Sequence, residues 1–279
     1  MKSNLEVKIE ADLSKPIDDI NSEIVMPPAK KISSGVTKLL SVVDTFIDNV
    51  TYKYLANSEY KKKQFLRNLE EKYKEIPEKF VVEPDISILG NTLDILKYNL
   101  DKDYLVDLYS NIMISDMDNR TKDYVHISFV EILKQLDKND LKILEAIYKM
   151  NDVKSIAFGK LRLVDSKGKF AGYELHNSIY MLNIKNYVID DYNLFSNSIE
   201  NLQRLGLIDV SYEKHFTDMT IYDNLLEKVK PSCNHILSEI DNTDVQFGCE
   251  RGILSISNLG FYLMKICLRD FEIGIDKNN

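Results

Sequence analysis

Two periodicities of apolar residues mark the start of the chain. Apolar and charged residues alternate strictly from Leu5 to Leu13, which is the pattern of a half-buried strand. From Ile32 to Tyr54 the apolar positions instead recur every three or four residues, as they do along one face of an amphipathic helix. We therefore predict an extended segment over residues 1–30 and then a long helix, and both features favour self-association.

Short helices separated by brief turns follow. Apolar positions at helical spacing predict helices over residues 58–75 and 85–98, with Asp85 as the N-cap of the second. A third helix is expected to start at Asp101. Because brief connections favour antiparallel neighbours, we expect residues 31–136 to form a helical bundle.

A helix-start signature lies near the end of this region. Ser128 is placed as an N-cap, Glu131 stands where its reciprocal partner belongs, and Ile127 can pack against Ile132 as a hydrophobic staple. Asp137 begins the next helix, and we place a domain boundary at this residue.

Strands enter the pattern after the boundary. Residues 160–164 and 170–175 flank the polar, glycine-containing turn 165–169, which predicts a hairpin. Residues 196–205 have the pattern of a helix, and Gly206 follows at the position where helices often end in the left-handed conformation.

The remaining pattern completes a recognisable order of elements. Strands are expected over residues 207–210 and 252–257, and a helix over 259–269 with Ser257 or Asn258 as its N-cap. Helix, helix, strand, strand and helix are the parts of a winged helix, here with two insertions. The sequence therefore predicts a mainly α protein in which an N-terminal helical bundle is followed by an α+β winged-helix-like domain over residues 137–279, with a hairpin insertion.

Composition and charge narrow the function classes. The 279 residues are 44% hydrophobic and include only 6 Pro and 10 Gly, which fits long helices joined by short connections. The net charge is -8, and neither half of the chain has an excess of basic residues. Since nonspecific affinity for nucleic acids comes from clustered Lys and Arg, neutralising phosphates is not expected to be the main task.

Location and cofactors follow from what the sequence lacks. The three cysteines are irregularly spaced, and no Cys/His pair has the spacing of zinc ligands. The sequence has no secretory signal and no uninterrupted apolar run of about 18 residues. The polar face of the first long helix carries Asp44 and Asp48, whereas membrane-surface helices are usually basic. We expect a cytoplasmic protein without a membrane span, a metal or a cofactor.

A polar cluster between two predicted helices is the best candidate site, and its members are Asp116, Asp118, Arg120, His126 and Glu131. These residue types suit a metal-dependent nuclease or another hydrolase. Their spacing matches no metal or triad motif, and nucleotide and esterase fingerprints are missing. Capping and turn formation explain much of the cluster, so we favour a structural role, assign no catalytic residue, and keep the hydrolase as an alternative.

Two further groups of polar residues are weaker candidates. A DNA-binding winged helix would present Asn197, Asn201 and Arg204 to base edges. Because Arg204 is the only cation of that helix, a protein-binding or structural winged helix is preferred over a DNA-binding regulator. His176 and His235 have no acidic partner at a telling spacing and are expected to be surface or packing residues.

Three stretches carry a family resemblance. They are Val25-Met26-Pro27-Pro28-Ala29-Lys30-Lys31, Val82-Glu83-Pro84-Asp85, and the segment 105–136, which contains Leu108-Tyr109-Ser110-Asn111-Ile112-Met113 and Val125-His126-Ile127-Ser128-Phe129-Val130-Glu131-Ile132. Together they resemble the abortive-infection alpha family of bacterial proteins over most of residues 15–150, with weaker agreement over residues 202–208 and 256–263. Where the family pattern reads His-Pro-Ser-Phe, Ile127 replaces the proline.

The resemblance implies a role in defence against phage, in which an infected cell stops growing or dies before the phage matures. It implies no catalytic residues. We therefore expect an interaction protein that acts as a sensor or effector through contacts with a protein partner or a second copy of itself.

Overall fold

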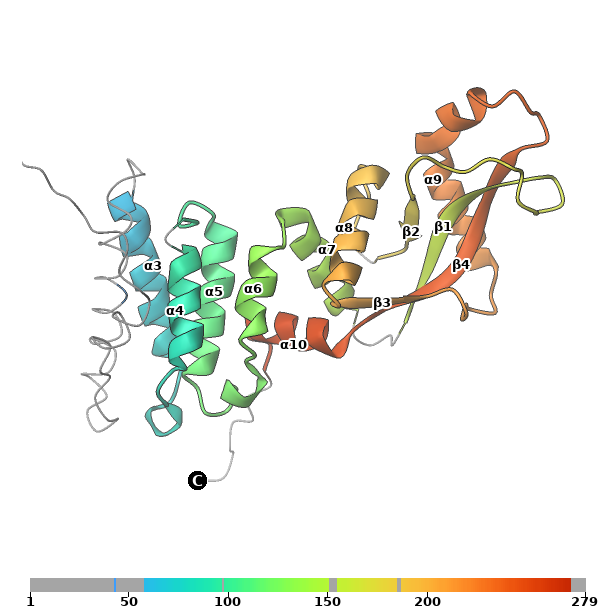
Figure 1. The fold of residues 1–279 in the computed structure, drawn as a ribbon. Coiled ribbons are helices and arrows are strands. Elements are labelled where there is room, and N and C mark those ends of the chain that lie inside the picture. Colours follow the sequence, from blue (N-terminus) through green and yellow to red (C-terminus); the bar gives the residue numbers. More distant parts are fainter. Residues whose placement is uncertain (1–42, 44–57, 97, 151–154, 185–186, 272–279) are drawn as a thin grey trace, which may run out of the picture. The chain divides into compact units, whose positions relative to one another are not determined.

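The computed structural model describes residue 43 and residues 58–96, 98–150, 155–184 and 187–271. Over these residues the fold is mixed, with eight α-helices and a small antiparallel sheet, and it is about 51% helical (Figure 1). The predicted combination of helices with a small sheet is confirmed. The strand expected from Leu5 and the helix expected from Ile32 lie outside the described residues, apart from Val43, which is helical and buried.

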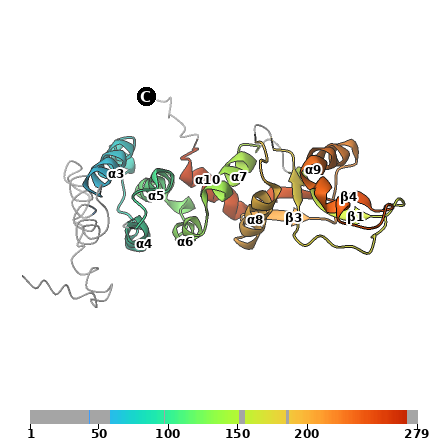
Figure 2. The ribbon, with the colours of Figure 1, turned by 90° about the horizontal axis from the view of Figure 1, so that it is seen from above.

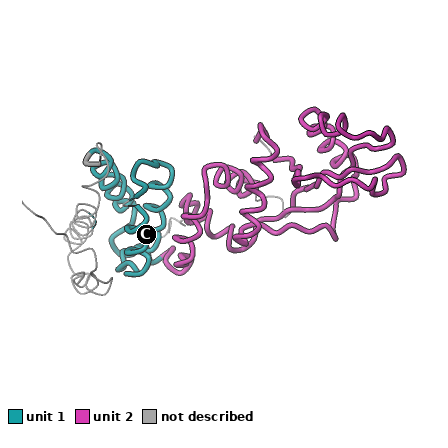
Figure 3. The backbone as a smooth tube through the Cα atoms, turned by 45° about the horizontal axis from the view of Figure 1, so that its top comes forward, with its two compact units in different colours: residues 1–119 teal, residues 120–279 magenta. Residues whose placement is uncertain are grey.

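The chain divides into two compact units, residues 1–119 and 120–279 (Figure 3). The boundary that we predict at residue 137 therefore falls inside the second unit, and the bundle and winged-helix domains stay predictions. Among the described residues, no helix has both the length and the apolar character needed to cross a membrane.

In the first unit, helix α5 packs against both α3 and α4 (Figures 1 and 2). The helices are α3 (Ser58–Tyr73), α4 (Ile86–Leu96) and α5 (Asp103–Asp116), with a 3-10 turn η1 (Glu78–Phe80) between the first two. Phe65, Leu69 and Tyr109 are almost fully buried. Lys61 and Lys72 of α3 pair with Asp103 and Asp107 of α5 at 2.6 and 2.9 Å, which adds polar links to the apolar contact.

Of the three helix starts predicted in this unit, those at residues 58 and 85 are correct and the third is displaced. Asp85 caps α4, because its Oδ1 accepts the backbone N–H of Ser87 at 2.7 Å. Helix α5 begins at Asp103 rather than Asp101, and the residue before it, Lys102, makes no side-chain cap.

The second unit contains five helices and the sheet. In chain order these elements are α6 (Ser128–Lys134), α7 (Lys138–Tyr148), β1 (Ile156–Val164), β2 (Tyr180–Leu182), α8 (Tyr192–Arg204), β3 (Ile208–Ser211), α9 (Thr220–Ser238), β4 (Gln246–Ile256) and α10 (Asn258–Cys267). Asp137 caps α7 as predicted, in a capping box with Asp140. Of the two residues predicted as possible caps of α10, Ser257 is the cap, and its Oγ accepts the N–H of Gly260 at 3.0 Å.

The sheet has the strand order β2-β1-β4-β3, and all its pairs are antiparallel. Phe158 of β1 lies opposite Leu182 on one side and Gly252 on the other, and Val210 of β3 lies opposite Leu254. The longest strand, β4, therefore occupies a central place although it comes last in the chain.

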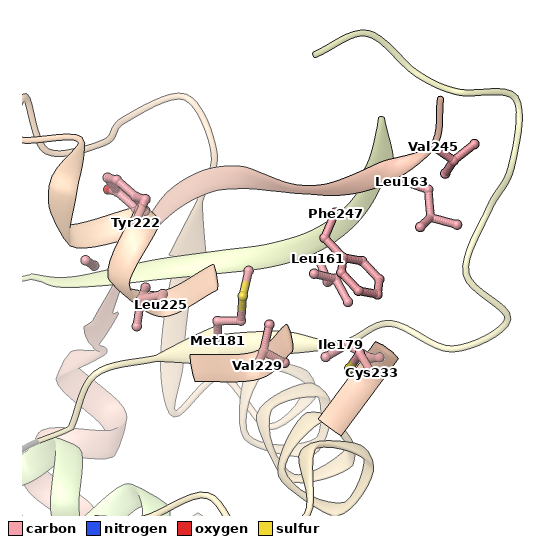
Figure 4. Close-up of a cluster of buried hydrophobic side chains, with 11 residues drawn as sticks. Leu161, Leu163, Ile179, Met181, Tyr222, Leu225, Val229, Cys233, Val245 and Phe247 are labelled. Carbon is pink, nitrogen blue, oxygen red and sulfur yellow. The ribbon is translucent and has the colours of Figure 1, made fainter. Parts of the chain in front are cut away.

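Helix α9 covers one face of this sheet (Figures 2 and 4). Its Tyr222, Leu225 and Val229 form a buried apolar cluster with strand residues that include Leu161 and Phe247. Helix α9 is absent from the sequence prediction.

The predicted hairpin is half correct. The turn forms, with Gly168 at a φ of 74° and the N–H groups of Lys167 and Lys169 bonded to Asp165 Oδ1. The second arm, residues 170–175, is not a strand, and only Phe170 bridges to β1. Gly172 has a φ of 82°, which turns the backbone out of the extended conformation, so β1 pairs with β2 and β4 instead.

The predicted helix 196–205 starts too late. Asp191 caps α8, with its Oδ1 accepting the N–H of Asn193 at 2.8 Å. Ser196 is buried inside the helix, and its Oγ accepts the backbone N–H of Tyr180 at 2.9 Å. The predicted end of the helix is correct, since Gly206 follows α8 in the left-handed conformation, with a φ of 70°.

Candidate functional site

The two aspartates of the polar cluster, Asp116 and Asp118, lie at the end of α5 in the first unit. Both are buried, with exposed fractions of 1% and 2%. Asp116 Oδ2 accepts the backbone N–H of Asp85 at 2.5 Å, so this carboxylate joins the end of α5 to the start of α4. Asp118 forms an antiparallel bridge with Val81. The geometry around Asp116 is that of a structural tie.

The other members lie in the second unit. Arg120 is half-buried, whereas His126 and Glu131 are exposed. His126 Nδ1 accepts the backbone N–H of Ser128 at 3.1 Å and lies 2.7 Å from Ser128 Oγ. Glu131 faces Lys134 at 3.9 Å, one helical turn further along α6. The described residues contain no group of three or more His, Cys, Asp or Glu side chains placed to hold a metal ion.

The predicted helix start at Ser128 is wrong in its details. The residue at the N-cap of α6 is Ile127, it makes no side-chain cap, and its side chain is 42% exposed rather than packed as a staple. The reason is local competition. In a capping box the Glu131 carboxylate would accept the N–H of Ser128, but His126 Nδ1 accepts it, so the imidazole takes the place predicted for the Glu131 side chain.

The candidate DNA-reading residues of α8 have different surroundings. Asn197 is exposed. Asn201 donates to Asp140 Oδ2 at 2.7 Å and to the carbonyl of Gln135 at 3.1 Å. Arg204 donates to Asn201 Oδ1 at 2.7 Å and to Gln135 Oε1 at 3.2 Å. Two of the three candidates therefore fasten α8 to the start of α7.

Two cavities adjoin the segment 173–177, which precedes β2. The smaller, about 250 Å³, lies beside Lys160 and Arg162 of β1, and Arg162 is ion-paired with Glu250. The larger, about 670 Å³, is bounded by the same segment, the start of α8 and the last turns of α9. We call the larger cavity the α9 groove.

Residues from distant parts of the chain meet in the α9 groove. His176 and His235 both line it and are surface residues, as predicted. Glu174 and Glu239 line the same groove, so acidic neighbours do exist. Sequence spacing could not reveal them, because the groove depends on how α9 and the segment before β2 fold onto the sheet.

The family model described as abortive infection alpha matches residues 57–267. The chain belongs to the abortive infection alpha family. The match extends across both units and includes the two C-terminal stretches of weaker agreement, whereas the stretch 25–31 lies outside it.

Other comparisons add little about this member of the abortive infection alpha family. No curated protein matches the chain. One solved structure is similar, an uncharacterized protein from the hydrocarbon-degrading marine bacterium Alcanivorax borkumensis SK2, at 16% identity and a TM-score of 0.32. The similarity covers 54% of this chain and 96% of that one.

Proposed function

We propose that this protein acts in abortive infection, as a sensor or effector that works through contacts with protein. The observation that carries the proposal is the family match, which covers both compact units rather than one fragment. A role that requires both units fits a protein that receives a signal and passes it on.

The bonds of the polar residues support contact rather than catalysis. Asp116 holds the start of α4, and His126 holds the start of α6. A catalytic carboxylate or imidazole must instead direct its reactive atom at a substrate. The hydrolase alternative would need these residues to leave their present partners.

Residues 137–279 fit a winged helix used for protein binding. Helices α7 and α8 pack together, and β3 and β4 form the antiparallel pair that would make the wing. Asn201 and Arg204 are bonded to the Gln135–Asp140 region, so two of the three candidates for base contact are already engaged within the protein. This arrangement favours a protein partner over duplex DNA.

Phage challenge of cells that express the protein tests the role. Plaque counts and host survival are scored at high and low multiplicity of infection, with empty-vector cells as the control. Protection of the culture at low multiplicity together with loss of infected cells at high multiplicity is the expected result. Equal plaque counts with and without the protein across a broad phage panel would contradict the role.

Location and self-association are tested separately. We propose a cytoplasmic protein, and cell fractionation is expected to recover it in the soluble fraction. Sedimentation velocity over a range of concentrations tests self-association. A single monomeric species at every concentration would leave a different protein as the partner.

A further inference from the structure

The α9 groove combines an apolar floor with an acidic rim. Leu163, Ile179 and Cys233 on its floor are at least nine-tenths buried, and Leu175 and Ile236 extend the apolar surface. A floor of this kind excludes water from an apolar side chain that is placed on it. The groove can therefore hold an apolar anchor.

Carboxylates line the rim from three different segments. Glu174 comes from the segment before β2, Asp190 from the turn before α8, and Glu239 from the end of α9. All three are exposed. Lys and Arg are absent from the described residues that line the groove.

The termini of helices α8 and α9 that lie at the groove do not offset its negative charge. Helix α9 ends there, and the C-terminus of a helix carries a partial negative charge. The N-terminus of α8 also lies there, but Asp191 accepts the N–H groups of Asn193 and Leu194 and adds a full negative charge. The electrostatic preference is therefore for a cation.

We propose that the α9 groove binds a basic peptide segment of a partner protein, with an apolar side chain on the floor and Lys or Arg side chains against the rim. Carboxylates on separate sides of one cavity match several cations on one chain better than a single amine. The proposal rests on the proposed function, because it names the chemistry of the partner in that interaction role.

Fluorescence polarisation with the full chain tests the proposal. The probe is a short fluorescein-labelled peptide in which lysines alternate with leucines. Same-length peptides with glutamate in place of lysine, or serine in place of leucine, are the controls. We expect the lysine–leucine peptide to bind most tightly, and its affinity to fall as salt is raised.

A charge-matched pair of variants assigns the binding to the groove. Glu174→Gln with Glu239→Gln removes two rim charges without changing side-chain size. Because two exposed ion pairs with the peptide are lost together, we expect this variant to weaken binding by about tenfold. Asp209→Asn with Glu213→Gln removes the same charge from exposed positions outside the groove and is expected to change affinity by less than about twofold.

Several outcomes would overturn the proposal. If the lysine–leucine peptide does not bind, the groove does not recognise a basic peptide. If the lysine–serine peptide binds equally well, the groove does not need an apolar anchor, and the proposal is again wrong. Equal weakening by both variants means that the overall negative charge attracts the peptide. Dimerisation that is abolished only by the groove variant, without peptide binding, assigns the groove to a second copy of the chain.

The test separates this proposal from the proposed function. Phage protection by the unaltered protein without peptide binding overturns the groove proposal alone. Peptide binding without protection against any phage overturns the abortive-infection role alone.

Discussion

The side-chain amide of Asn201 lies 2.7 Å from Oδ2 of Asp140 and donates to it. Asp140 is itself the reciprocal partner in the capping box of α7, so one carboxylate serves both a helix start and a neighbouring helix. The bond fixes α8 against α7 through a polar contact at a position where a DNA-binding protein would present a base-reading residue.

Asn201→Ala is expected to destabilise the protein by about 1–2 kcal/mol, because it leaves the carboxylate of Asp140 with one partner fewer. Urea unfolding measures the loss. Asn197→Ala, on the exposed face of the same helix, is the matched control and should stay within about 0.5 kcal/mol of the unaltered protein. A similar change in both variants would contradict the bracing role of Asn201.

His126→Ala is expected to lower stability by about 1 kcal/mol, because the N–H of Ser128 loses its acceptor at the start of α6. His126→Asn supplies an acceptor at a similar place and should restore most of the stability. Thermal unfolding and phage protection are measured on both variants. If His126→Asn folds as the unaltered protein does and yet gives no protection, the imidazole has a chemical task beyond holding the helix.

Asp116→Ala should be the most damaging change in the polar cluster, with a loss of about 2–3 kcal/mol, since the N–H of Asp85 loses the buried, charged acceptor that Asp116 supplies. Asp116→Asn keeps a carbonyl oxygen and is expected to lose less. Guanidinium unfolding compares the two. Equal stability of all three proteins, together with loss of phage protection in both variants, would support the hydrolase alternative.

Ser196→Ala tests how the free edge of the sheet is closed. Strand β2 lies at one edge, and the N–H of Tyr180 donates to Ser196 Oγ rather than to another strand. Loss of this buried acceptor is expected to destabilise the second unit by about 1–3 kcal/mol. Hydrogen exchange at Tyr180 should become faster. Unchanged exchange in the variant would mean that another group protects this N–H.

The Cys249 thiol is expected to react slowly at neutral pH. Burial raises its pKa from the ordinary value near 9 to about 11, although the guanidinium of Arg251 acts in the opposite direction. At pH 8 roughly one thiol in a thousand is then ionised, and iodoacetamide should modify Cys249 far more slowly than free glutathione. Mass spectrometry of alkylated peptides gives the rate at this one position.

The same raised pKa fixes the sign of a pH effect on stability. The folded state holds Cys249 as the neutral thiol, so its contribution is complete below pH 9 and is lost as the pH rises through about 11. Alkylation should accelerate over the same range. A rate that is already maximal at pH 8 would contradict the burial of this thiol.

Features set by neighbouring residues could be predicted from the sequence. Asp85, Asp137 and Ser257 each bond to an N–H two or three residues away, and these three caps are correct. Gly206 is correct for the same reason, since its left-handed conformation depends on the local backbone. Ser128 and Glu131 have the spacing that a capping box requires. His126 instead accepts the N–H of Ser128, and the spacing alone does not reveal this competing acceptor.

Features set by distant residues could not be predicted. The partner of Asp116 is 31 positions earlier in the chain, and the α9 groove joins residue 174 to residue 239. Helix α9 contains Pro231, which is unfavourable inside helices, so its pattern alone does not indicate a helix of 19 residues. Its place follows from the sheet face that it covers.

The strand order β2-β1-β4-β3 has a consequence for synthesis on the ribosome. Strand β3 pairs only with β4 among the described strands, and β1 pairs with β4 along its whole length. Until residues 246–256 have left the ribosome, β3 has no partner and β1 has only the short β2. Nascent chains of the second unit therefore expose unpaired strand edges until a late stage of synthesis. During this period they are most accessible to chaperones and proteases. A truncated product cannot assemble this sheet, so any activity that depends on it is confined to chains translated beyond the last strand.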